Sequence, residues 1–106
     1  MSLPKLPAAV FSHLGPVAVE RVPKVDDADS LGECDFHARR IKVKTGVVPM
    51  VEWATLGHEM MHAVVCDAGG DTVITDAQTE WLCDVFGTYL AAAVAAGWIV
   101  VRAPKG

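Results

Sequence analysis

The stretch LGHEMMHAVV, Leu56 to Val65, is the most informative part of this 106-residue chain. Two histidines, His58 and His62, lie four residues apart in a run that is otherwise apolar, and Glu59 lies between them. We predict a helix over Pro49 to Cys66, because Pro49 suits a first helical turn and apolar residues recur at helical spacing. Residues four apart share one face of a helix, so the two imidazole rings point to one place.

The spacing of the two histidines is that of two ligands of one Zn²⁺ ion. Glu59 points about 100° around the helix from His58, so it lies beside the metal, where it can accept a proton from water. This is the HExxH arrangement of zinc peptidases. The metzincin extension needs Gly and His at the third and sixth positions after His62, and Val65 and Ala68 stand there instead. The alternative is a scaffold without metal, in which both histidines are core residues.

A catalytic zinc site needs a third protein ligand. Glu80, near the start of a second predicted helix, is the best candidate. Asp84 lies one turn later on the same face, where it could accept the second ring N–H of a ligand histidine. Cys66 and Cys83 are rival ligands, and a thiolate in place of Glu80 would indicate a structural site.

The second long helix begins at a capping box, in which Gln78 follows Thr75 by three residues, and continues to about Ala96 before Gly97. One of its faces is small and acidic. The other is bulky and is expected to face the core; its members are Leu82, Val85, Phe86, Tyr89 and Ala93.

The first third of the chain predicts a small sheet. We expect a short helix over Pro7 to Leu14, stopped by Gly15-Pro16, and then a valine-rich strand over Val17 to Val22. The alternation between Cys34 and Lys44 predicts a hairpin that turns near Arg39-Arg40, and its outward lysines suit an edge strand.

The connections and the end of the chain complete the predicted fold. Residues 71–74 read as a short connector that could be extended, and the apolar tail 98–101 is expected to pack on the sheet rather than cover a cleft. The prediction is one α+β domain over residues 1–106, with a short N-terminal helix, a small mixed or antiparallel sheet with an edge hairpin, and two long helices.

Composition narrows the possible functions. The chain is 52% apolar and its net charge is −4. No basic run interleaved with aromatic residues supports direct nucleic-acid binding, and no run of 18 apolar residues supports membrane insertion. Three widely spaced cysteines do not form a disulfide framework, and the N-terminus lacks the apolar centre of a signal peptide. We therefore expect a cytoplasmic protein.

Together, HEMMH at 58–62 and EWLCDVF at 80–86 resemble the gluzincins, above all the ImmA/IrrE-type peptidases and the single-domain minigluzincins. The resemblance covers about residues 31–96, and the hairpin looks like the strand pair beside the cleft of that family. It implies a zincin-like, zinc-dependent endopeptidase. His58, His62 and Glu80 would bind Zn²⁺, Glu59 would be the general base, and Asp84 would support a histidine. The substrate would be a peptide or protein, by analogy a regulatory protein.

The chain departs from that family in two respects. The ordinary family carries Ala where Cys83 stands, and larger gluzincins use an additional His or Tyr to stabilise the oxyanion. Tyr89 is expected to face the core, His37 on the hairpin is a possible helper, and His13 has no motif context. The alternative function is therefore a zinc-binding domain that is latent or inactive and acts as a regulatory or interaction module.

Overall fold

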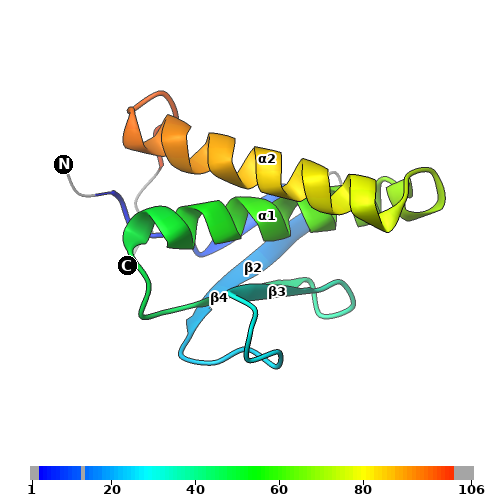
Figure 1. Cartoon of the computed structure of the whole chain (residues 1–106), viewed down its shortest axis with the longest axis horizontal. Coiled ribbons are helices and arrows are strands. Elements are labelled where there is room, and N and C mark those ends of the chain that lie inside the picture. Colours follow the sequence, from blue (N-terminus) through cyan, green and yellow to red (C-terminus); the bar gives the residue numbers. More distant parts are fainter. Residues whose placement is uncertain (1–2, 13, 102–106) are drawn as a thin grey trace.

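A computed structural model describes residues 3–12 and 14–101, and it confirms the α+β class. Four strands form one sheet in the order β1-β2-β4-β3 (Figure 1). The elements in chain order are β1 (Ala9–Ser12), β2 (Gly15–Val22), β3 (Gly32–Asp35), β4 (Arg40–Lys44), α1 (Pro49–Asp67), a 3₁₀ turn (Gly70–Thr72) and α2 (Asp76–Ala95).

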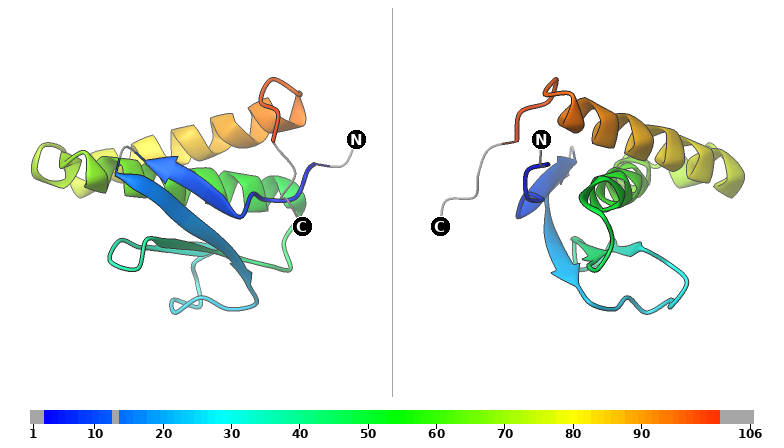
Figure 2. Two further views of the ribbon diagram at one scale, coloured as in Figure 1. Left: turned by 180° about the vertical axis from the view of Figure 1, so that it is seen from behind. Right: turned by 60° about the vertical axis from the view of Figure 1, so that its left-hand side comes forward.

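Helix α1 is the middle layer of the molecule. It packs against β1, β3 and β4 on one side and along α2 on the other (Figure 2). Val17, Ile41 and Val43 of the sheet meet Trp53 and Leu56 of α1, and all five are almost fully buried. Burial of apolar side chains on both faces of α1 therefore fixes the helix that carries the histidine pair. In the described part of the chain, no helix is long and apolar enough to cross a membrane.

The helix predicted over Pro7 to Leu14 is wrong. Residues 9–12 form β1, which pairs antiparallel with β2 so that Ala9 lies opposite Ala18. Gly15 has φ +121°, and with Pro16 it begins β2 after a tight turn instead of ending a helix. Pairing with the longer β2 gives the backbone of this short segment partners that the sequence does not reveal locally. His13 lies outside the described residues.

The predicted edge hairpin is confirmed, but the lysine-bearing strand is its inner strand. β3 and β4 pair antiparallel, with Asp35 opposite Arg40. β4 is not the edge strand, because it also pairs in parallel with β2, which leaves β3 at the edge. Lys42 of β4 lies 3.7 Å from Glu33 of β3. The outward lysines thus mark a solvent-facing side of the sheet and not its edge.

Both long helices follow their predicted bounds closely. Pro49 begins α1, and the capping box of α2 is present: the backbone N–H of Gln78 donates to Thr75 Oγ1 at 3.1 Å, and that of Thr75 donates to Gln78 Oε1 at 2.8 Å. The connector is a 3₁₀ turn and not extended. Gly97 follows α2 with φ +78°.

The prediction that the bulky face of α2 is buried is wrong in part. Val85 is 48% exposed and Tyr89 is 59% exposed. The helix instead packs through a narrow set of residues, most of them small: Cys83, Gly87, Leu90, Ala91, Ala93 and Val94.

Two glycines explain why α2 packs through its narrow face of mostly small residues. A Cβ added at Gly57 would lie 2.7 Å from the Cα of Gly87, and one added at Gly87 would lie 2.4 Å from the carbonyl oxygen of Ala54. The helix backbones therefore touch at this point, and only small neighbours fit around it. Beyond α2, Ile99 and Val101 of the tail pack against the core cluster, whereas Trp98 and Val100 are exposed.

Candidate metal centre

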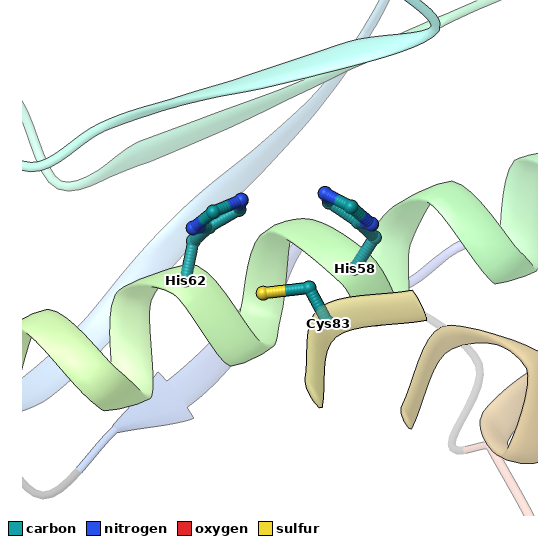
Figure 3. A group of neighbouring side chains, drawn as sticks. All are labelled: His58, His62 and Cys83. Carbon is teal, nitrogen blue, oxygen red and sulfur yellow. The ribbon is translucent and has the colours of Figure 1, made fainter. Parts of the chain in front are cut away.

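The two histidines of α1 present their rings on one side of the helix, as the four-residue spacing predicts. Their ring centroids are 5.0 Å apart, with the planes at 61°. Figure 3 shows both rings rising from the same side of α1, with Cys83 of α2 lying between the two histidine positions. Each imidazole is about one quarter exposed, at 23%, so the pair lies at a surface that an ion can reach.

Glu80 of α2 contacts both histidines at once. Its Oε1 lies 2.8 Å from Nε2 of His62, and its Oε2 lies 3.3 Å from Nε2 of His58. The three side chains proposed from the sequence as metal ligands are therefore brought together, with the same ring nitrogen of each histidine directed at one carboxylate. Glu80 is half exposed, so it lies at the mouth of the group and the histidines lie deeper.

Asp84 contacts the other side of His58. Its Oδ1 lies 2.9 Å from Nδ1 of that ring. A neutral ring that donates Nδ1–H to Asp84 has its Nε2 lone pair facing Glu80. This Nε2 and Oε2 of Glu80 are then two acceptor atoms 3.3 Å apart, and they repel each other unless a proton or a cation lies between them. A carboxylate that orients a ligand histidine through Nδ1 is also the usual outer partner in zinc sites.

Cys83 is the second thiol candidate raised by the sequence, and it reaches the histidines. The ligand atoms of His58, His62 and Cys83 all lie within 4.8 Å of one another, as do those of His58, Glu80 and Asp84. Cys83 is fully buried, and burial, reinforced by the charges of nearby carboxylates, raises its pKa to about 12. Cys66 belongs to neither group among residues 3–12 and 14–101.

The donors present fit zinc. Imidazole nitrogen, carboxylate oxygen and thiolate sulfur are its three protein ligand types, and two histidines with one carboxylate form a known catalytic set. Metal binding by these residues is a prediction from their chemistry.

Glu59 lies beside this group in a sheltered position. It is 8% exposed and lines the same cleft as His58 and Glu80. Burial raises the pKa of Glu59 to about 7; the charge of His58 lowers this pKa, and the charges of Glu80 and Glu33 raise it further. The carboxyl group is thus separated from bulk water yet open to the cleft.

The cleft has a volume of about 690 Å³ and lies between the 29–32 segment, α1 and α2. Two of its lining residues, Gly32 and Thr55, contact each other at its border. A Cβ at Gly32 would lie 2.6 Å from Thr55 Cγ2 and 3.4 Å from Glu59 Cγ. Gly32 therefore lets the edge strand approach α1 next to Glu59. The hairpin was expected beside the cleft, but the sequence did not indicate this close contact of Gly32 with Thr55.

The proposed helper residues do not reach the cleft. His37 is exposed in the β3–β4 turn and lines a separate hollow. Tyr89 was expected to face the core, but it is exposed, with its ring 6.4 Å from that of Phe86. Among the cleft residues that the structure describes, His58 is the only one from the group His, Tyr, Lys and Arg.

Comparison with protein-family models, with curated proteins and with solved structures gave no match for this chain. The function is therefore argued from the side chains of this cleft.

Proposed function

We propose that this chain is a small zinc-dependent endopeptidase that acts on a peptide or protein substrate in a reducing, cytoplasmic compartment. The observation that carries the proposal is the contact of one carboxylate, Glu80, with the Nε2 atoms of both His58 and His62. Three ligand groups of the types that catalytic zinc uses thus converge from two helices.

Five side chains at or beside the cleft have a role in this proposal. His58, His62 and Glu80 would hold the ion, and Asp84 would keep His58 in the tautomer whose Nε2 is free to bind it. When bound, zinc polarises a carbonyl oxygen and lowers the pKa of a water molecule. Glu59 would accept the proton of the attacking water and pass it to the leaving amine.

The shape of the cleft supports a peptide as the substrate. Glu59 lies where α1 faces Gly32 at the beginning of the edge strand, so the base and the sheet border the same open space. The volume of about 690 Å³ is large enough for several side chains of a substrate.

The second candidate is a zinc-binding regulatory or interaction module with little catalysis. It is favoured by the composition of the cleft, because no Tyr, Lys or Arg and no second His of the described chain lines it. In that case the donors that stabilise an oxyanion in efficient hydrolases would be missing.

Zinc content and hydrolysis test the proposal together. We expect about one zinc per chain in the wild-type protein, and weaker binding with a lower melting temperature in Glu80→Ala, because the ion would stabilise the fold to which it binds. Glu59→Gln should keep zinc and lose hydrolysis of a peptide library. Asp76→Asn, an exposed acid at the start of α2, is the control for charge.

The outcomes separate the candidates. Zinc binding without hydrolysis by the wild type would favour the interaction module. No zinc after addition of the metal would end both proposals, and unchanged zinc affinity in Glu80→Ala would remove Glu80 as a ligand.

A further inference from the structure

We infer that Cys83 is a fourth protein ligand of this centre and binds the metal through its thiolate, which holds the site in a closed form. The inference rests on the proposed metal site and adds the group that would regulate it. The family resemblance did not imply it, because that family carries Ala at this position.

The position of Cys83 carries the inference. Its sulfur and one ring nitrogen of each histidine form a group in which every pair lies within 4.8 Å. The side chain is fully buried and directed from α2 toward the space between His58 and His62 (Figure 3). Two further ligand residues therefore lie within reach of an ion that the sulfur would bind.

The packing of the helices keeps the sulfur there. Cys83 lies one turn before Gly87, whose contact with the backbone of Ala54 and His58 holds α2 against α1. The side chain of Cys83 lies on the buried, α1-facing side of α2, close to this contact. Glu80 lies nearly one turn further out and is half exposed, so the oxygen ligand is the one that solvent reaches.

Thiolate binding has a defined chemical balance. The S–H bond breaks, the sulfur–metal bond forms, and the proton leaves to solvent, with no change of oxidation state. Together with Glu80, the two histidines and Cys83 would give the ion four protein ligands, which is the number in structural zinc sites without an open position. Hydrolysis would then require one of these ligands to leave, and Glu80, which is half exposed and lines the cleft, would be the ligand that leaves.

Cobalt substitution tests the inference without an activity assay. Co²⁺ occupies zinc-type sites, and a thiolate ligand gives it a near-ultraviolet charge-transfer band that nitrogen and oxygen ligands do not give. We expect this band in the wild-type protein loaded with Co²⁺, and its loss in Cys83→Ala. The double variant Cys34→Ala/Cys66→Ala should keep it, and this variant leaves the buried position untouched.

Three results would decide the matter. A band that is present in the double variant and absent from Cys83→Ala supports the inference. Co²⁺ binding with no thiolate band in the wild type, or with a band that disappears from the double variant, overturns it and leaves the site of two histidines and Glu80 in place. No Co²⁺ or Zn²⁺ binding at all overturns the metal site itself, and the inference with it.

Discussion

The substitution Gly87→Ala tests the contact that brings the two halves of the candidate site together. The added Cβ would lie 2.4 Å from the carbonyl oxygen of Ala54 and 3.1 Å from the backbone nitrogen of His58. Ordinary carbon–oxygen contacts are about 3.3–3.6 Å, so α2 has to move away from α1 by about 1 Å. Both neighbouring atoms belong to the backbone of a helix, so they cannot rotate aside.

The expected magnitude is the difference of two opposing effects. Alanine favours a helix over glycine by about 1 kcal/mol. Overpacking costs about 1–3 kcal/mol, and we take about 3 because the clash is with backbone. The net loss is about 2 kcal/mol, which lowers the melting temperature of a domain of this size by about 8–16 °C.

Thermal unfolding of the zinc-free protein, followed by circular dichroism, measures this change for Gly87→Ala. Thr88→Ala, at the exposed next position, is the control because it improves helix propensity without entering the contact. Zinc affinity should also fall in the glycine variant, since α2 carries Glu80 away from both histidines. A melting temperature equal to or above that of the wild type would show that the two backbones are not in contact, and the reasoning would be refuted.

Three further predictions concern other parts of the chain. Asp84→Ala should lower zinc affinity by about 10–100-fold, while Asp76→Ala on the same helix should leave it unchanged; equal effects would remove the orienting role. Arg39→Ala should cost about 1–3 kcal/mol in chemical denaturation, because its carboxylate partner on α1 is buried, whereas Arg40→Ala, from an exposed ion pair, should cost less than about 1 kcal/mol. Burial raises the pKa of Cys34 from 9.0 to about 12, so its protonated thiol stabilises the fold fully below pH 9 and this contribution is lost as the pH rises through 12. The melting temperature should therefore fall over that range, and less in Cys34→Ala; identical curves would contradict the burial of this thiol.

The sequence predicted best the elements whose signals are local. Pro49, the Thr75–Gln78 capping box and Gly97 mark helix ends through contacts within a few residues, so the helix bounds agree with the structure. The alternation around Cys34 and Lys42 is also a local signal, and the hairpin is present.

The errors arose where partners distant in sequence decide the outcome. Residues 9–12 are too few to specify a helix or a strand, and pairing with Ala18 and its neighbours makes them a strand. Which face of α2 is buried depends on Gly57 of α1. This glycine allows the narrow face of α2 to approach closely, so the bulkier face, which carries Val85 and Tyr89, is left exposed in part. No pattern within α2 contains that information.

The candidate site likewise combines residues that local sequence signals reveal with residues that only the fold brings together. His58, Glu59 and His62 are recognisable because helical spacing alone puts them together. The approach of Glu80 to both rings could be proposed from the sequence only as one of several options. The access of Cys83 to the same point, and the role of Gly32 beside Glu59, depend on how closely helix and strand backbones approach α1.

The contact between Gly57 and Gly87 is also a pivot about which α2 can tilt relative to α1. Glu80 lies seven residues from Gly87 and Cys83 lies four, which is about 10 Å and about 6 Å along a helix. A tilt of α2 by about 10° about this pivot moves the carboxylate end by about 2 Å and the sulfur by about 1 Å. The longer displacement equals a whole metal–oxygen bond. In the proposed metal centre, such a rotation would carry Glu80 about twice as far as Cys83, so the oxygen ligand would leave the histidine pair before the sulfur.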